Sequence, residues 1–312
     1  MRPKKLTMGL KRLPFHYLYI LRPANLMMIL LGQVLALLSI APIGTKQDLI
    51  TTYGLFILGT LTVAGAGYLI NDYYDRVSDR INLEQAPRIT AFSQTSEVLM
   101  YYLTLNAIAL FCGGVLADKI EYAGLMLVFP FVAVLLYLYA RIPWLKLGLG
   151  AVLISVFVAA TILLIPWIET LRRIQFLEYA LDDTVWRFFF AVGLSAFWLN
   201  LMREFIKDIQ DINGDKNGQR TTLPIAIGIK RTQNLVVGMG VMGALAAVYW
   251  FFMIYTISYG LAVHLIAVIL GLLFFCRQTL NAKHTQNFKS LSLQLKLIML
   301  IGMLSLCWLY VF

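Results

Sequence analysis

The chain has 312 residues, of which 60% are hydrophobic and only 13% are charged, whereas a soluble domain averages about 45–50% apolar and about 25% charged residues. This excess of apolar side chains, with a mean hydropathy of +0.77, excludes a water-soluble globular protein and indicates a lipid bilayer as the surrounding solvent. The net charge of +10 matches the anionic cytoplasmic surface of a membrane, so no nucleic-acid partner is expected.

Taken in chain order, nine apolar runs are long enough to cross a bilayer, since about 20 helical residues span its hydrocarbon core of about 30 Å. We expect these helices at residues 22–42, 50–71, 97–116, 120–140, 147–168, 186–208, 234–257, 259–277 and 290–312. Little of the chain is left for a soluble part. The sequence therefore predicts an all-α, polytopic membrane protein, with about nine transmembrane helices in one bundle and a single domain over residues 1–312.

Lysine and arginine residues predict the orientation of the bundle, because they gather in cytoplasmic loops. If the N-terminus is cytoplasmic, only five of the 26 basic residues fall on the outer side. These five are Lys46, Lys119, Arg172, Arg173 and Arg187. We therefore expect a cytoplasmic N-terminus, in an integral protein of the bacterial inner (plasma) membrane.

Two acidic motifs follow the second and the sixth predicted helices, both on the predicted inner side. The first, Asn71–Asp79, reads NDYYDRVSD, and the second, Lys207–Asp215, reads KDIQDINGD. In both motifs aspartates stand at relative positions 0, 3 and 7, and residues at this spacing share one face of a helix. The repeated spacing at two helix ends indicates a common site.

The charges around these motifs indicate which ligand the site would take. Carboxylates gathered at low dielectric repel one another, so a cation is needed to offset them. Mg²⁺ prefers carboxylate oxygens and binds through one or two of them together with substrate phosphates. Lys207 lies inside the second motif, and Arg141 and Lys146 follow the fourth helix on the same side. Acids, Mg²⁺ and fixed cations together are suited to binding a di- or polyphosphate.

At this point the residues resemble a known family. Asn-Asp-x-x-Asp-x-x-x-Asp after one helix, and Lys-Asp-x-x-Asp-x-x-Gly-Asp followed by Thr222–Pro224 after another, resemble the UbiA superfamily of intramembrane prenyltransferases. The stretches Arg22–Asn25 and Tyr139–Arg141 extend the resemblance over most of the chain.

The resemblance implies helices around a central cavity, with the two motifs facing each other across its cytoplasmic mouth. It implies that Mg²⁺ ions bind the diphosphate of a prenyl donor beside a membrane-soluble acceptor, among membrane lipids. The Mg²⁺ ligands would be Asn71, Asp75, Asp79, Asp208, Asp211 and Asp215. The catalytic residues would be Asp75, Asp211, Asp215 and Lys207. The substrate-binding residues would be Asn25, Arg88, Tyr139, Arg141, Lys146 and Arg203.

Two further stretches bear on the branch of the family. The Arg203–Asp208 segment, REFIKD, most resembles the branch of archaeal-type ether-lipid enzymes, which transfer geranylgeranyl to a glycerol-phosphate lipid. After the first motif the chain departs from the family pattern, because Glu84–Ser93 reads EQAPRITAFS. Proline there precedes the arginine, the usual glycine is missing, and Arg88 matches the family arginine.

We therefore expect Mg²⁺-dependent transfer of a prenyl group from a prenyl diphosphate to a lipid or aromatic acceptor. One alternative is a catalytically altered member that binds a lipid, suggested by the changed loop, although all six motif aspartates are retained. Another alternative is a secondary transporter, but such proteins bind their substrates near the bilayer midplane, whereas these acids stand at helix ends. The acceptor, the donor chain length and the oligomeric state are left open.

Overall fold

A computed structural model describes residues 15–40, 42–82, 94–142, 148–218, 221–254 and 258–311, without the side chains at 15–16, 77–82, 254 and 309–311. The described chain is helical, with no strand among these residues. Its helices are α1 Phe15–Ile20, α2 Pro23–Ser39, α3 Lys46–Asn82, α4 Thr95–Lys119, α5 Gly124–Arg141, α6 Leu149–Leu177, α7 Asp183–Gln210, α8 Ile212–Asn217, α9 Leu223–Ile227, α10 Ile229–Ile254, α11 Tyr259–Asn281 and α12 Thr285–Leu304, with a 3₁₀ helix at Ser305–Val311.

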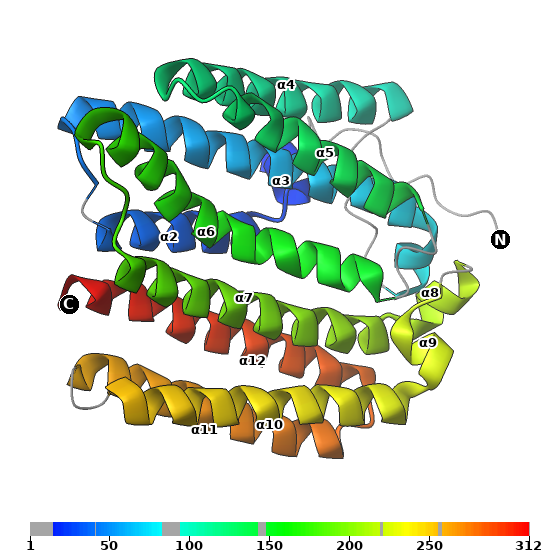
Figure 1. Cartoon of the computed structure of the whole chain (residues 1–312). Coiled ribbons are helices and arrows are strands. Elements are labelled where there is room, and N and C mark those ends of the chain that lie inside the picture. Colours follow the sequence, from blue (N-terminus) through cyan, green and yellow to red (C-terminus); the bar gives the residue numbers. More distant parts are fainter. Residues whose placement is uncertain are drawn as a thin grey trace.

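The long helices lie side by side in one bundle (Figure 1). Eight of the described helices are long and apolar enough to cross a membrane, and α2 is a shorter apolar helix of 17 residues. Each predicted transmembrane segment coincides with one of these nine. The prediction of an all-α, polytopic membrane protein with about nine helices is therefore confirmed.

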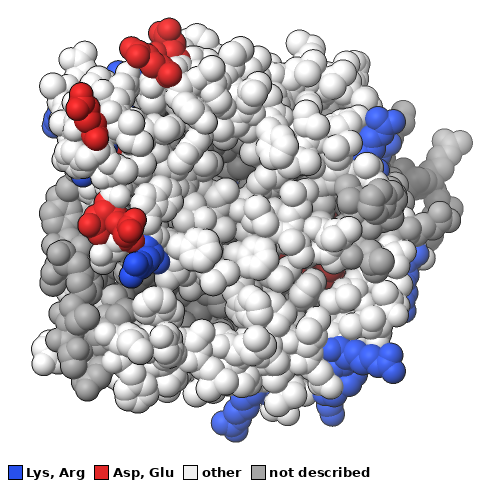
Figure 2. All heavy atoms as spheres, in the orientation of Figure 1, with Lys and Arg blue, Asp and Glu red and all other residues white. Residues whose placement is uncertain are grey.

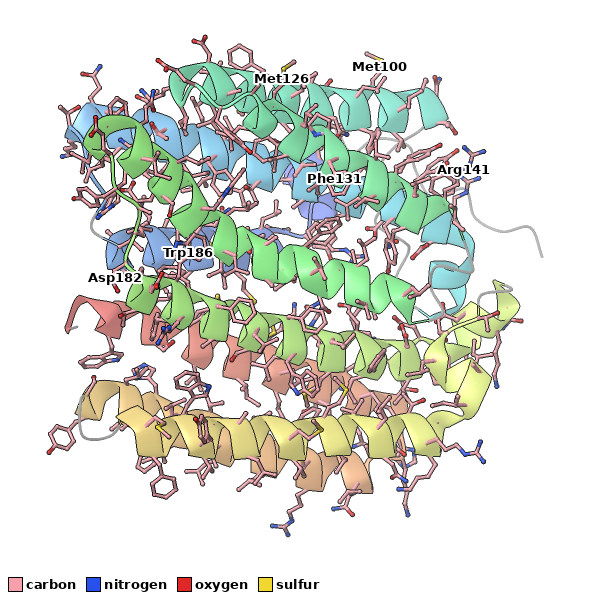
Figure 3. The ribbon with its side chains drawn as sticks, viewed as in Figure 1. Met100, Met126, Phe131, Arg141, Asp182 and Trp186 are labelled. Atoms are coloured by element: carbon pink, nitrogen blue, oxygen red, sulfur yellow. The ribbon has the colours of Figure 1, made fainter. Side chains whose placement is uncertain are left out.

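The outer surface of the bundle is suited to lipid. Met100, Met126 and Phe131 are exposed and point away from the helices that carry them (Figure 3). On the face shown in Figure 2, most charged side chains lie toward the two ends, and the surface between them is mostly uncharged. Lys and Arg dominate the end at which α8 lies, as the predicted cytoplasmic side requires, while the orientation itself stays a prediction.

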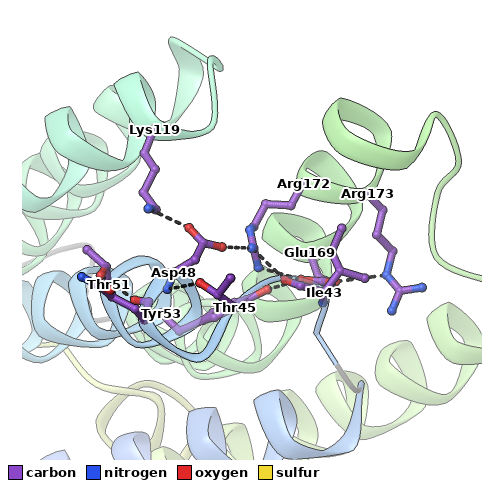
Figure 4. Close-up of polar contacts among 10 residues, drawn as sticks. Ile43, Thr45, Asp48, Thr51, Tyr53, Lys119, Glu169, Arg172 and Arg173 are labelled. Carbon is purple, nitrogen blue, oxygen red and sulfur yellow. Dashed lines mark hydrogen bonds and ion pairs between the residues drawn. The ribbon is translucent and has the colours of Figure 1, made fainter.

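The end of the bundle opposite α8 is closed by a buried carboxylate, Glu169 of α6, which is 0% exposed (Figure 4). Glu169 accepts hydrogen bonds from Ile43 N at 2.9 Å, Tyr53 Oη at 2.5 Å, Arg172 Nη1 at 3.2 Å and Arg173 Nε at 3.1 Å. A buried charge is tolerated only when it is paired and hydrogen-bonded. These four donors meet that requirement.

The same network joins three helices through Asp48 of α3. Asp48 pairs with Arg172 of α6, and Lys119 at the end of α4 lies 2.7 Å from the Asp48 carboxylate. Arg172, only 2% exposed, also donates to the Ile43 carbonyl at 2.8 Å. Because every charge here has a partner, we assign the network a structural role.

The helix α3 carries one acidic motif out of the membrane. Its 37 residues correspond to about 55 Å at about 1.5 Å per residue, which exceeds the hydrocarbon thickness of about 30 Å. The apolar run of α3 ends at Ile70, and the first motif begins at Asn71, so this motif lies where the helix leaves the bilayer.

Candidate active site at one end of the bundle

A cavity of about 1160 Å³ opens between the helices. Most of its lining side chains are aliphatic or aromatic, contributed mainly by α2, α3, α5, α6, α7, α10, α11 and α12. Most of the charged lining residues lie toward the end that holds α8, while Arg187 and His264 line the cavity elsewhere. The charged and polar residues toward α8 are Arg22, Asn25, Tyr68, Asn71, Tyr139, Arg203, Glu204, Lys207 and Lys296. The volume exceeds that of a usual small-molecule pocket, about 300–1,000 Å³, so the cavity is suited to a long apolar chain with a charged head.

The first acidic motif faces this polar end from α3. Asn71 and Asp75 are one helical turn apart, and Asn71 Nδ2 donates a 2.9 Å hydrogen bond to Asp75 Oδ2. The remaining amide atom, Asn71 Oδ1, is buried and has no hydrogen-bond partner in the described part of the chain. An unsatisfied buried acceptor costs about 1–3 kcal/mol, so this oxygen is suited to a cation or an added donor. The predicted ligand Asp79 lies outside the described side chains.

The second acidic motif crosses a break between two helices. Helix α7 ends at Gln210 and α8 begins at Ile212, with Asp211 at the junction. The spacing alone predicted that the three acids of this motif share one continuous helix. The structure differs, because the helix breaks at Asp211. Backbone hydrogen bonds still bridge the junction, from Asp211 N to Lys207 O at 2.9 Å and from Asp215 N to Asp211 O at 3.1 Å.

The two motifs lie close enough to act on each other. Helix α8 packs against α3. Burial raises the pKa of Asp211, Lys207 opposes this rise, and the carboxylates of Glu204 and Asp75 add to it. Asp75 belongs to the first motif and Asp211 to the second, so the repulsion predicted between the motifs is present in the structure.

The donor set fits Mg²⁺ held jointly with a substrate. Among the described side chains, no three His, Cys, Asp or Glu residues form a ready-made metal cluster. Mg²⁺ commonly keeps several waters and takes only one or two carboxylates together with substrate phosphates. The unsatisfied Asn71 Oδ1, with Asp75 beside it and Asp211 opposite, meets that requirement.

Basic side chains on α7 are held in place by a buried acid. Glu204 is buried, and its carboxylate lies 2.7 Å from Arg203 Nη1 and 3.4 Å from Lys207 Nζ. Arg203 Nε is also buried and has no hydrogen-bond partner among the residues that the structure describes. Arg203 and Lys207, both predicted to bind anions, thus line the cavity and have N–H groups available for further hydrogen bonds.

Arg22 is a cavity residue to which the sequence alone assigned no role. Its guanidinium pairs with the buried Asp72 at 2.5 Å and lies 5.3 Å from the centre of the Tyr68 ring. Arg22 has a left-handed backbone, with φ 55°, and such strain costs about 1–3 kcal/mol and tends to occur at functional sites. The ion pair holds Arg22 in place, so the partner of Asp72 differs from those of the predicted ligands Asn71 and Asp75, which bond each other.

Lys296 is the second residue that sequence reasoning missed. It lies in the middle of α12, and its Nζ donates a 2.8 Å hydrogen bond to Oδ1 of Asn25 on α2. The available signal was a lone cation inside the last apolar run, because ionisable residues within membrane helices are rare and mark functional sites. The predicted substrate residue Asn25 therefore lines the cavity with a cationic partner.

The remaining predicted substrate residues differ in their placement. Tyr139 lines the cavity. Arg141, at the end of α5, is exposed and donates to Tyr137 Oη at 3.3 Å (Figure 3), outside the cavity lining. Arg88 and Lys146 lie outside the described residues. The roles predicted for Arg141, Arg88 and Lys146 stay predictions.

Comparison with known proteins adds a family and several relatives. Residues 25–304 match the sequence model of the UbiA prenyltransferase family. The digeranylgeranylglyceryl phosphate synthase of Methanosphaera stadtmanae is 28% identical over 292 residues, which cover 92% of this chain and 95% of the relative. The enzyme of the same name from Thermococcus kodakarensis is 33% identical over 69% of this chain and 70% of its own.

A solved structure shares the fold. A UbiA homologue from Archaeoglobus fulgidus, bound to DMAPP and Mg²⁺, aligns with a TM-score of 0.57 at 18% identity, over 93% of this chain and 99% of its own. These relatives come from archaea, so they give no support to the predicted bacterial inner membrane. The prediction of an integral membrane protein is supported by the apolar helices and the family match.

Proposed function

This chain belongs to the UbiA prenyltransferase family, and we propose that it transfers a prenyl group from a prenyl diphosphate to a prenylated glyceryl phosphate lipid within the membrane. The names of its relatives support this acceptor. The observation that carries the proposal is the placement of Asn71 and Asp75 opposite Asp211 at the polar end of a deep apolar cavity.

The donor diphosphate would bind at the two acidic motifs. Bound Mg²⁺ would neutralise charge on the diphosphate, and Asn71, Asp75, Asp211 and Asp215 would hold it. The roles of Asp79 and Asp208 as further ligands stay predictions. Lys207, fixed by Glu204 at the cavity wall, adds a positive charge that strengthens the hold on the diphosphate.

The reaction is a substitution at the first carbon of the prenyl chain. The bond from this carbon to the diphosphate oxygen breaks, and its electron pair leaves with the diphosphate. The acceptor hydroxyl oxygen forms the new carbon–oxygen bond, and the hydroxyl proton leaves with the diphosphate. Charge that develops on the leaving group is stabilised by preorganised cations. The rings of Tyr68 and Tyr139 line the same end of the cavity, where a π-face stabilises a developing allylic cation.

The apolar walls explain why such a reaction takes place inside a membrane protein. The cavity walls include Phe129, Leu136 and Phe157, which accept a prenyl chain and keep water from the reacting carbon. Exclusion of water prevents hydrolysis of a reactive intermediate. The match over residues 25–304 supports one functional unit across nearly the whole chain.

The decisive experiment measures product formation by the purified protein in detergent. We would combine radiolabelled geranylgeranyl diphosphate with geranylgeranylglyceryl phosphate, with and without Mg²⁺, and expect a Mg²⁺-dependent, lipid-soluble product. The Asp75→Asn variant should lose turnover, while the matched control Asp183→Asn, an exposed acid at the opposite end of the bundle, should keep it. Donor binding without turnover on any acceptor would instead favour the alternative of a lipid-binding member.

A further inference from the structure

Lys296 is difficult to explain by the donor site alone. It lies near the centre of the membrane helix α12, where a cation is costly unless it serves a function. Its hydrogen bond goes to the neutral amide of Asn25, and no carboxylate pairs with it among the described residues. A buried ammonium that lacks an acidic partner is a position at which an anionic ligand would be stabilised.

Cations predominate among the charged side chains that act most strongly on Lys296. The strongest charges around it are those of Arg203, Lys207, Arg22 and Glu204. Asp72 pairs with Arg22, and Glu204 is shared between Arg203 and Lys207. Asp211 also acts on Lys207 and Arg22, so Lys296, which has no carboxylate partner among the described residues, is the least compensated of these four cations. Like charges gathered at low dielectric repel one another strongly, and a bound anion would offset that repulsion.

The donors in this cluster match a phosphate group. Arg203 Nε is buried without a partner among the described residues, and the Lys296 ammonium has three donors, of which one is used by Asn25. A phosphate monoester offers several acceptor oxygens and forms strong, charge-assisted hydrogen bonds with guanidinium and ammonium groups. A neutral hydroxyl or phenol would not offset the charge of Lys296.

Two members of this cluster, Lys296 and Asn25, lie on helices that carry none of the proposed Mg²⁺ ligands, whereas Arg203 lies on α7 one turn before Lys207. The proposed Mg²⁺ ligands come from α3, α7 and α8, whereas Lys296 comes from α12 and reaches α2. Two substrates that each have a charged head must occupy the same cavity during transfer. The second head group therefore requires cations that the donor diphosphate does not use.

Resting on the proposed prenyl transfer, we propose that Arg22, Arg203 and Lys296, with Asn25, form a second anion subsite that binds the phosphate group of the acceptor lipid. This subsite selects phosphate monoester lipids over neutral alcohols and phenols. Lys207 and the acidic motifs remain with the donor diphosphate.

The experiment compares Lys296→Met with Lys296→Arg, which keeps the charge, and with Lys289→Met, an exposed lysine on the same helix. The Michaelis constants for geranylgeranylglyceryl phosphate and for the donor are measured separately. Loss of a charged hydrogen bond should raise the acceptor constant about 10- to 100-fold in Lys296→Met, with the donor constant unchanged. Lys296→Arg should keep the acceptor constant close to the wild-type value, and Lys289→Met should leave it unchanged.

A second comparison replaces the acceptor with its dephosphorylated form, geranylgeranylglycerol. The wild type should strongly prefer the phosphate, and Lys296→Met should lose most of that preference. An unchanged acceptor constant in Lys296→Met, or an equal rise in both constants, would overturn the subsite. If Lys296→Met does not fold, Arg203→Gln is tested by the same comparison.

Direct binding separates failure of this proposal from failure of the proposed function. Binding of radiolabelled geranylgeranylglyceryl phosphate to the purified protein is measured without donor. If the wild type shows no turnover but binds this lipid more tightly than Lys296→Met does, the result would support the subsite and contradict the transferase proposal. Equal binding by both proteins would contradict the subsite whatever the turnover.

Discussion

Replacing Asp72 with asparagine would separate two roles that the structure gives to acids of the first motif. Asp72 is 3% exposed and pairs with Arg22, whereas Asp75 bonds Asn71 and acts on the second motif. The change keeps the shape of the side chain and removes its charge. A hydrogen bond to a charged group contributes about 1.5–3 kcal/mol. Solvent screens this contribution only slightly here, because Asp72 is buried and Arg22 is only partly exposed.

We expect Asp72→Asn to cost about 2–3 kcal/mol in the positioning of Arg22, which corresponds to a decrease of about 30- to 150-fold in kcat/KM for the acceptor. The Mg²⁺ concentration needed for half-maximal binding of a labelled donor should stay at the wild-type value, because Asp72 is not a Mg²⁺ ligand in our proposal. Steady-state kinetics and donor binding at varied Mg²⁺ measure the two quantities.

The matched comparison is Asp75→Asn in the same motif, which should raise the Mg²⁺ requirement for donor binding. An equal rise in Asp72→Asn would refute the reasoning, since it would make Asp72 a ligand. Unchanged kcat/KM for the acceptor in Asp72→Asn would refute the positioning role of the pair with Arg22.

Three further predictions concern the metal, the opposite end of the bundle and helix packing. Removing divalent cations with EDTA should abolish donor binding, because the motifs and the diphosphate are all negative, and added Mg²⁺ should restore it; donor binding in EDTA would contradict the site. Glu169→Ala should destabilise the protein by about 3–5 kcal/mol, because it removes one of the two carboxylates that pair with the buried Arg172 and leaves Tyr53 Oη and Ile43 N without their acceptor. A thermal melt should show this loss, while kcat of the folded fraction stays at the wild-type value. Gly240→Ala should destabilise by about 1–3 kcal/mol through overpacking, because the added Cβ would overlap Cys276 Sγ; Cys276→Ala in the same chain should restore the melting temperature, and no restoration would place the strain elsewhere.

Several features of this protein follow from its sequence alone. Apolar runs of membrane-spanning length predict helices because the backbone has no water to bond in lipid, and every predicted run coincides with a helix in the structure. The first motif, at Asn71 and Asp75, was predicted on a helix at the end of the second run and is found there. Both motifs were predicted at one end of the bundle, because they follow the second and the sixth transmembrane helices and an even number of crossings returns the chain to the same side. The packing of α8 against α3 agrees with this prediction.

The tertiary structure decided which polar groups meet. The spacing of the second motif suggests one continuous helix, but the chain breaks at Asp211. Two acids of the first motif also have different partners, since Asp75 accepts a hydrogen bond from Asn71, whereas Asp72 pairs with Arg22, which lies 50 residues away in the sequence. Lys296 reaches Asn25 across 271 residues. Helical periodicity is a local property and records which face a residue occupies, whereas the partner on that face depends on how distant helices pack, and only the folded bundle determines that.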